Sequence, residues 1–218
     1  MQRMVLTRTI SEEITWSDIQ KMLQEGTHIF QLYPGIIIKE ELKNRKLQEW
    51  VVTDLGSEYI RFEARNCIGN KYHKMNRDCT NVGGIASSLM QEYLNNDIWN
   101  LLPGDLQDVI STVDRKYMDG AEEKTYQTKL FLPSASEVFN ENNCFGEENL
   151  YKQLYYYKDC RHRIKRDGFW CGSAPWWLSS PLSGTESGFC SVTTAGASDY
   201  NSASYSLGVA PCFMITKS

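Results

Sequence analysis

Positive charge is missing from the C-terminal part of this chain: residues 167–216 contain no lysine and no arginine, although the 218 residues include 23 of them. The stretch alternates between apolar positions such as Trp176 and Trp177 and runs of small polar residues such as residues 198–202. This pattern is typical of short strands joined by polar loops. Ser, Thr, Gly, Asn, Asp and Tyr on a rigid frame are typical of binding surfaces, whereas catalytic sites need titratable groups with shifted pKa values. The stretch therefore predicts a binding surface.

The composition argues against nucleic-acid and membrane partners. The net charge is -4, and the one basic cluster, residues 161–166, fits a solvated turn or helix end better than a nucleic-acid interface. The N-terminus lacks the apolar run of a signal peptide, and no segment approaches the roughly 20 apolar residues that span a bilayer. We therefore expect a soluble chain made in the cytoplasm, which would reach a virion tail or a cell surface by a route such as lysis.

The cysteines predict free thiols rather than disulfides or a metal site. Their number, 7, is odd, and no secretory signal accompanies them, so we expect mostly buried thiols. Cys160, His162 and Cys171 do not have the spacing of a common zinc motif, and no Asp/Glu cluster marks a calcium site. We expect neither a metal nor a cofactor.

The N-terminal half predicts one helix followed by an antiparallel meander. Residues 15–24 place Trp16, Ile19 and Leu23 at helical spacing, with a cap at Thr15 or Ser17 and an end at Gly26. Short apolar runs predict strands at residues 28–32, 36–38, 50–52 and 59–62, joined by turns at residues 34–35 and 55–57.

Helix and strand signals also divide the middle of the chain. An apolar stripe predicts the main helix over residues 85–96, and Pro103 predicts the start of a second short helix. Residues 129–132 predict a strand, after which Ser134 and Glu137 form a capping-box signature for one helical turn. Residues 140–159, which are polar and rich in tyrosine, predict an irregular excursion.

The C-terminus predicts three further strands, at residues 176–178, 189–193 and 209–215. The alternation in the second predicts that Cys190 and Val192 face the core, while Ser191 and Thr193 face outward. Pro211 predicts an edge position or a bulge for the last strand.

Three C-terminal motifs resemble a known family. Residues 176–181 (WWLSSP), 189–192 (FCSV) and 207–213 (LGVAPCF) are similar to a large uncharacterised family of gut-bacterial and phage domains. Residues 93–97 resemble that family's "WLNN" helix, and residues 130–137 resemble its strand-to-helix step. The resemblance covers residues 29–215. The chain departs from the family at Ser179, where arginine is usual, and at Cys212, where glycine is usual.

The resemblance implies a fold and a domain organisation. The family is similar to the C-type-lectin-like fold shared with formylglycine-generating and sulfatase-modifying proteins. It therefore implies a mixed α+β fold with short antiparallel sheets, two or so helices and long loops. The expected organisation is an N-terminal helical segment at residues 1–26 and a C-type-lectin-like domain at residues 27–218, whose variable ligand-binding region spans residues 176–213.

The resemblance also implies a function. Some members resemble variable proteins of diversity-generating retroelements, which randomise adenines in a repeat at the 3′ end of the target gene. A randomised AAC codon yields chiefly Ser, Thr, Gly, Asp, Tyr, Ala and Asn, and the C-terminal stretch is rich in that set, although Glu186 falls outside it. We therefore expect a phage- or prophage-encoded receptor-binding or adhesin-like protein, whose ligand is a protein or glycan on a cell surface.

This interpretation divides the variable region into two sets of residues. The residues expected to face the ligand are Ser179, Leu182, Ser183, Thr185, Ser187, Ser191, Thr193, Thr194, Ser198, Asp199, Tyr200, Asn201, Ser202, Ser204 and Tyr205. The residues expected to form the structural frame are Trp176, Trp177, Phe189, Cys190, Val192, Gly208 and Pro211.

Three alternatives remain open at this point. The polar runs could be plain solvated loops. The chain could be a formylglycine-generating-type oxidoreductase with Cys190 and Cys212 as its reactive pair, although reactive thiols need an electropositive neighbourhood and residues 167–216 offer no Lys, Arg or His. It could also be a structural tail-fibre component without its own ligand, with the Tyr-rich residues 151–157 either at a homo-oligomer interface or in the core.

Overall fold

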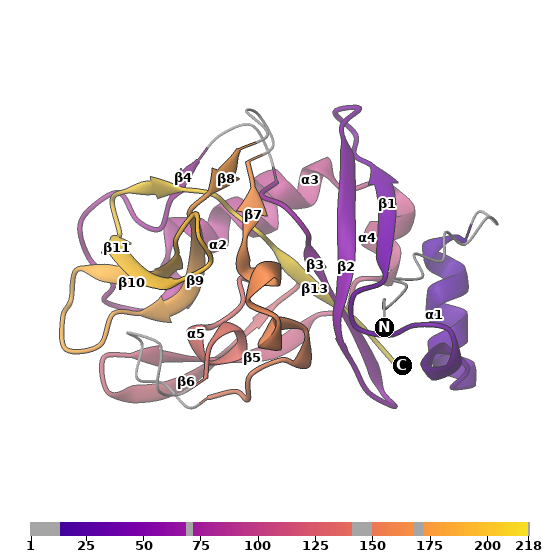
Figure 1. Ribbon diagram of the computed structural model, residues 1–218. Coiled ribbons are helices and arrows are strands. Elements are labelled where there is room, and N and C mark those ends of the chain that lie inside the picture. The colour runs from indigo at the N-terminus through magenta and orange to yellow at the C-terminus, as the bar shows by residue number, and fades with distance from the viewer. Residues whose placement is uncertain (1–13, 69–71, 141–149, 168–171, 218) are drawn as a thin grey trace, which may run out of the picture.

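The computed structural model describes residues 14–68, 72–140, 150–167 and 172–217 and has a mixed α+β fold with several short antiparallel sheets (Figure 1). The α-helices are α1 (Trp16–Glu25), α2 (Leu89–Tyr93), α3 (Trp99–Leu101), α4 (Gly104–Val109) and α5 (Ala135–Val138). The 3-10 turns are η1 (His28–Phe30), η2 (Ile85–Ser87), η5 (Tyr155–Lys158) and η6 (Cys160–Arg163), and η3 (Leu94–Ile98) is a π-helical turn. The predicted α+β class is confirmed.

Within the described residues, the strands form one four-stranded sheet, one three-stranded sheet and three two-stranded pairs. In chain order they are β1 (Ile37–Glu41), β2 (Leu47–Leu55), β3 (Tyr59–Ala64), β4 (His73–Lys74), β5 (Val113–Asp119), β6 (Glu122–Thr128), β7 (Lys165–Arg166), β8 (Ser173–Ala174), β9 (Trp176–Pro181), β10 (Gly188–Val192), β11 (Ser198–Ser202), β12 (Ser206–Leu207) and β13 (Cys212–Thr216).

The largest sheet has the strand order β1-β2-β3-β13, so the C-terminal strand pairs with a strand from the first half of the chain. The first three strands are three of the four strands of the predicted meander, and β13 takes an edge position. This last strand begins at Cys212, after Pro211, rather than at residue 209 as predicted. Phe213 lies opposite Phe62 in the register, and their rings stack with centroids 5.2 Å apart. This aromatic pair joins the end of the chain to its N-terminal half.

The first helix packs against the same pair of rings. A capping box at Thr15 begins α1, and Gly26 ends it with a φ of 73°, a conformation that glycine adopts without strain. The Trp16 ring lies edge-on to Phe62 at 5.3 Å and to Phe213 at 5.8 Å. Residues of α1 therefore belong to one hydrophobic core together with the four-stranded sheet (Figure 1).

Residues 28–32 were predicted as a strand, and this was wrong, because the segment begins with the 3-10 turn η1. His28 and Leu32 are buried, whereas Ile29 and Phe30 are 52% and 84% exposed. Buried positions four residues apart are typical of a helical turn, whereas a strand buries every second residue. A run of five apolar residues does not distinguish these two periods.

The middle of the chain also differs from the prediction. The expected helix over residues 85–96 is a succession of short helical turns, η2, α2, η3 and α3, which runs to Leu101. The expected strand at residues 129–132 is reduced to an isolated bridge between Phe131 and Cys212. By contrast, α4 follows Pro103, and the capping box of Ser134 and Glu137 begins α5, both as predicted.

Among the described residues, none of the helices is both long and apolar enough to cross a bilayer.

Candidate ligand-binding surface

Most of the expected structural frame lies on β9 and β10 of the three-stranded sheet, whose order is β11-β10-β9. Every residue of β9 and β10 is buried. Gly208 and Pro211, which follow these strands in the chain, are buried as well. A fully buried pair of strands gives the neighbouring loops a fixed base, because interiors of this kind are close-packed and resist deformation.

Both faces of this sheet are covered. The indole N–H of Trp176 donates to the carbonyl oxygen of Arg163 at 2.9 Å, and that of Trp177 donates to the carbonyl oxygen of His73 at 2.8 Å. Adjacent residues of a strand point to opposite faces, so the two tryptophans fix the sheet from two sides.

A close approach at Gly208 fixes the sheet further. Trp176 and Gly208 form an isolated parallel bridge, and a Cβ atom at Gly208 would lie 2.4 Å from the Cys67 sulfur. Only glycine fits this contact without a shift of its neighbours.

Two of the residues expected to face a ligand are buried instead, which corrects the predicted surface. Ser191 has no exposed area, and its hydroxyl accepts a hydrogen bond from the Asn201 side chain at 3.0 Å. Ser179 is only 9% exposed, and its backbone N–H donates to the carbonyl oxygen of Pro133 at 2.9 Å. The alternation in β10 implied one solvated face, but both faces of this strand are covered, so position in the strand did not predict exposure.

The other residues expected to face a ligand lie at least partly at the surface. Tyr200 on β11 is 48% exposed, and Tyr205 in the turn after it is 63% exposed. Ser183, Thr185 and Thr194 are exposed, and the remaining ones, Leu182, Ser187, Thr193, Ser198, Asp199, Asn201, Ser202 and Ser204, are partly exposed. We call the loop of residues 182–187 together with residues 198–205 the C-terminal surface. It combines the edge strand β11 with the loop between β9 and β10.

A segment distant in sequence holds this surface in place. The side-chain amide of Asn81 donates to the carbonyl oxygens of Thr185 at 3.0 Å and Gly188 at 2.8 Å. The backbone N–H of Asn81 donates to the carbonyl oxygen of Glu186 at 2.9 Å. Asn81 is only 6% exposed. Buried carbonyl groups need such partners, so this side chain positions the loop of residues 182–187.

The same segment adds two residues that the sequence interpretation missed. The Cys79 sulfur accepts a hydrogen bond from the Ser202 hydroxyl at 3.0 Å, and Val82 is 59% exposed. Cys79 comes more than 100 residues before Ser202, and Val82 directly follows Asn81 in the chain. No local pattern around residues 79–82 signals this placement.

Replacing Asn81 with alanine is expected to loosen the loop of residues 182–187. The change removes the side-chain hydrogen bonds to the carbonyl oxygens of Thr185 and Gly188, although Gly188 keeps the backbone N–H of Leu182 as a donor. Each lost bond costs about 0.5–1.5 kcal/mol of the free energy of unfolding. Amide hydrogen exchange should become faster in this loop, while exchange in β2 and β3 stays as in the wild type. Unchanged exchange in the loop would show that Asn81 does not hold it.

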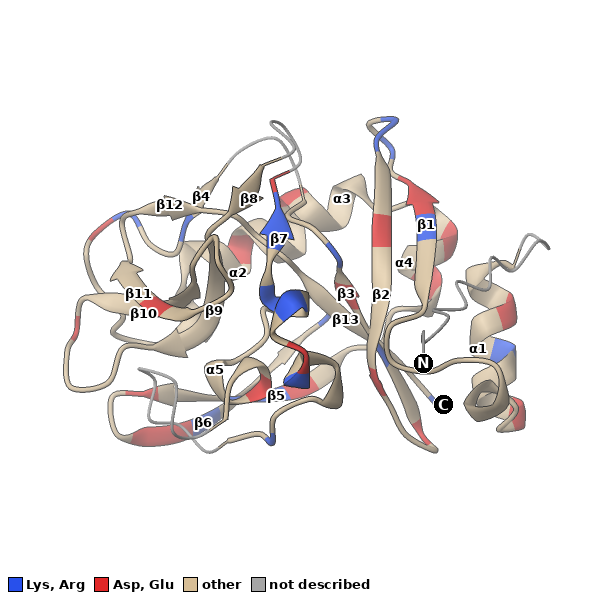
Figure 2. Cartoon of the chain, viewed as in Figure 1, with Lys and Arg blue, Asp and Glu red and all other residues tan. Residues whose placement is uncertain are grey.

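The C-terminal surface carries little charge. Glu186 and Asp199 are its only charged residues, and Lys and Arg are absent from the strands β9 to β12 and the loops between them (Figure 2). Basic residues outside this surface include the exposed Lys74 on β4, which lies opposite Ser206 in the register. On η6 and β7, Arg161 pairs with Asp159 at 2.6 Å and Lys165 is buried. Contacts at this surface would therefore depend on hydrogen bonds and aromatic area rather than on strong electrostatic attraction.

The strongest electrostatics lie in the interior, around Glu137. Its carboxylate pairs with Arg61 and, at 2.7 Å, with Arg115, and it accepts the backbone N–H of Ser134 at 2.8 Å. Burial alone would raise the pKa of Glu137, but the charges of Arg115 and Arg61 lower it to about 2. The cluster connects α5, β3 and β5, which makes it a structural tie between three elements.

A second buried cluster surrounds Glu63. Lys165 pairs with its carboxylate at 2.8 Å, the Tyr157 hydroxyl donates to it, and the Cys212 thiol lies 3.4 Å from it. The side chains of Glu63, Lys165, Tyr157 and Cys212 are all essentially without exposed area. Tyr156 and Tyr157 are therefore core residues, whereas Tyr155 is 72% exposed.

The structure corrects the expectation that Cys212 has no basic neighbour. Although no basic residue is near it in sequence, Arg61 Nη2 lies 3.5 Å from its sulfur. Burial nevertheless raises the pKa of the thiol, and the nearby carboxylate of Glu63 raises it further. Such a thiol stays protonated and therefore reacts slowly.

The described cysteines form no disulfide. Cys67, Cys190 and Cys212 are buried and Cys79 and Cys160 are exposed, while Cys144 and Cys171 lie outside the described residues. Within the described ranges no group of three or more His, Cys, Asp or Glu side chains could hold a metal ion.

Comparison with known proteins places the chain in a family. A family model described as a domain of unknown function (DUF6273) matches residues 52–217, so the chain belongs to this family. The match spans the strands from β2 to β13 and includes the whole C-terminal surface. No curated protein and no solved structure matches the chain.

Proposed function

We propose that this member of the DUF6273 family is a ligand-binding protein that contacts a cell-surface protein or glycan through the C-terminal surface. The observation that carries the proposal is the contrast within residues 176–213: β9 and β10 are buried throughout, whereas Tyr200 and Tyr205 beside them are 48% and 63% exposed. Exposed tyrosines with small polar neighbours on a rigid base are characteristic of recognition loops, because tyrosine offers large contact area at a low cost in conformational entropy.

We further propose that the C-terminal surface is diversified by a retroelement and that the fold is C-type-lectin-like, as in a phage or prophage receptor-binding or adhesin-like protein. The support is that residues within the adenine-randomised set occupy most of the exposed positions of the C-terminal surface, with Glu186 as an exception, while the buried frame consists of Trp, Phe, Cys, Val, Gly and Pro. Diversification of exposed positions on a buried frame changes the ligand without a loss of folding.

The gene itself offers the test of diversification. We expect a reverse-transcriptase gene nearby and a near-copy of the segment that encodes residues 176–213, which differs from it only at adenines. The differences should fall in codons for exposed positions such as Tyr200 and Tyr205 and should spare the codon for Ser191, whose side chain is buried. Differences scattered over other bases, or the lack of any near-copy, would contradict diversification.

Replacing Tyr200 and Tyr205 together with alanine is expected to abolish binding of the labelled protein to its target cells without lowering the melting temperature. Two large exposed aromatic side chains contribute contact area to a partner but little to the core. Cell binding and thermal unfolding measured on the same samples test the expected loss of binding and the unchanged melting temperature. The matched control is Tyr155→Ala, because Tyr155 is 72% exposed but lies outside the C-terminal surface. Normal binding by the double variant would place the binding site elsewhere.

Burial favours this proposal over the formylglycine-generating-type alternative. Cys190 and Cys212 have no exposed area, and the pKa of Cys212 is raised by burial. Thiol labelling of the folded protein distinguishes the two functions: a binding protein should label first at the exposed Cys79 and Cys160 among the described cysteines. Rapid labelling of Cys212 would favour the oxidoreductase.

The structural tail-fibre alternative differs in its oligomeric state and in its ligand. Burial of Tyr156 and Tyr157 favours a core role for these two tyrosines of the Tyr-rich stretch rather than a role in a homo-oligomer interface. Light scattering of the purified chain measures the oligomeric state. A stable trimer that binds no cells would favour the structural role.

A further inference from the structure

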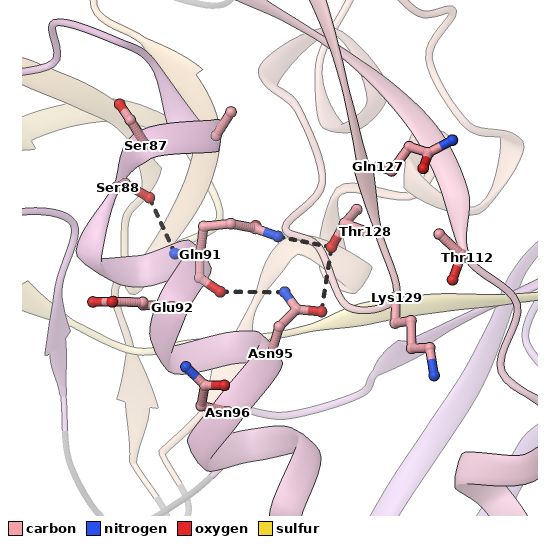
Figure 3. Close-up of a pocket in the computed structure, with 11 residues that line it drawn as sticks. Ser87, Ser88, Gln91, Glu92, Asn95, Asn96, Thr112, Gln127, Thr128 and Lys129 are labelled. Carbon is pink, nitrogen blue, oxygen red and sulfur yellow. Dashed lines mark hydrogen bonds between the residues drawn. The ribbon is translucent and has the colours of Figure 1, made fainter.

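A hollow of about 650 Å³ lies between the helical run η2–α2–η3 and the β5–β6 hairpin (Figure 3). Its volume is within the range of small-molecule sites. None of the residues that line it belongs to the C-terminal surface, so the proposed function does not account for it.

The lining is polar and close to neutral. It consists mainly of amide and hydroxyl side chains, and its one carboxylate, Glu92, is offset by one ammonium group, Lys129. The Lys129 ammonium is also held over the Trp99 ring, 4.4 Å from its centroid. A charged ligand gains little from such a site, whereas a neutral ligand with many hydroxyl groups finds both donors and acceptors.

Internal hydrogen bonds hold one wall of the hollow in a fixed arrangement. Asn95 pairs with the backbone of Leu130 in both directions, accepting its N–H and donating to its carbonyl oxygen, both at 3.0 Å. The Thr128 hydroxyl lies 2.7 Å from the same carbonyl oxygen. It also lies 2.7 Å from Gln91 Nε2 and 3.3 Å from Asn95 Oδ1 (Figure 3). Because this hydroxyl donates its one proton to the Leu130 carbonyl or to Asn95 Oδ1, it accepts from Gln91. The Gln91 amide is therefore oriented by its partners.

That orientation leaves the amide oxygen of Gln91 buried without a hydrogen-bond partner. Buried acceptors of this kind are uncommon and costly. The wall also contains the π-helical turn η3, a conformation found frequently at functional sites. A small shift of the Gln91 side chain would bring its oxygen to a ligand hydroxyl in the hollow.

We propose that this hollow is a second binding site, which takes a neutral polyhydroxylated small molecule such as a mono- or disaccharide. The site recognises hydroxyl groups through Gln91, Asn96 and Gln127, and the Asn95–Thr128 hydrogen bonds position Gln91. It is separate from the C-terminal surface, so either site can fail without the other.

Saturation-transfer NMR of the full chain with glucose, galactose, mannose, N-acetylglucosamine and sucrose tests the proposal. At least one sugar should bind and shift the side-chain amide resonance of Gln91, which is assigned by its absence from the Gln91→Ala variant. That variant should bind the sugar at least about tenfold more weakly, as the loss of one good hydrogen bond implies. The matched control is Gln31→Ala, which removes an exposed amide outside the hollow and should leave binding unchanged.

A second variant keeps the test independent of the folding of Gln91→Ala. Asn96 is exposed at the hollow, so Asn96→Trp should fill the hollow and abolish sugar binding while the Gln91 network stays intact. The double variant Tyr200→Ala, Tyr205→Ala should still bind the sugar, which separates this site from the proposed function. The proposal is overturned if no sugar of the panel binds, if acetate binds as well as the sugars, or if Asn96→Trp binds normally.

Discussion

Replacing Lys165 with methionine is expected to lower the free energy of unfolding by about 3–5 kcal/mol, because it leaves the buried carboxylate of Glu63 without its cation. Lys165 Nζ lies 2.8 Å from Glu63 and 2.9 Å from the carbonyl oxygen of Ala64, and neither charged side chain has exposed area. Methionine keeps most of the volume but removes the ammonium, which also lies 4.8 Å from the centroid of the Trp176 ring, so the loss comes mainly from the charge. Urea unfolding at pH 7 measures it.

A double variant separates the charge from the packing. Adding Glu63→Gln to Lys165→Met removes the stranded charge and should recover at least about half of the loss, since neutral replacements of buried ion pairs are often tolerated. The matched control is Lys116→Met, which breaks an exposed pair with Glu123 at 2.6 Å and should change stability by less than about 1 kcal/mol. If the double variant is as unstable as Lys165→Met, packing rather than charge explains the effect.

The helix caps were predicted from local signals, because the caps of α1 and α5 depend on residues within one helical turn, and both are present. The β5–β6 hairpin was missed, although its two-residue turn, Gly120-Ala121, has glycine at the first position, which is a usual hairpin signal. Its strands have little apolar alternation, because most of their residues are partly or fully exposed.

The candidate site was predictable only in part, because contacts between residues far apart in the sequence determine which of its side chains are buried. The buried frame could be inferred from its large apolar residues, but the burial of Ser191 depends on Asn201 and on elements that cover both sheet faces. Asn81 and Cys79 reach the surface from more than 100 residues away, and one sequence without variation data does not reveal such contacts. The ion pairs of Glu137 were missed for the same reason. Its role in the capping box was visible in the sequence, whereas its partner Arg61 lies 76 positions away.

Acid is expected to destabilise this protein through Glu137. Its pKa is about 2 in the folded protein, against 4.5 for an ordinary glutamate, so the folded state favours the ionised form. The resulting stabilisation is fully present above pH 4.5 and is lost as the pH falls from 4.5 towards 2. A difference of this size corresponds to about 3 kcal/mol. Urea unfolding at a series of pH values between 2 and 7 measures the loss.

The variant Glu137→Gln identifies the group responsible. At pH 7 it leaves Arg61 and Arg115 together in the interior without their counter-ion, so we expect a loss of about 3–5 kcal/mol in the free energy of unfolding. Towards pH 2 the wild type loses the same ionic contacts, so the two stability curves should converge. Glu41→Gln, which breaks the exposed pair of Glu41 with Arg45, should instead follow the wild-type curve at every pH. Parallel curves for the wild type and Glu137→Gln would mean that other carboxylates cause the acid sensitivity, and that Glu137 contributes only its helix-capping hydrogen bond to Ser134.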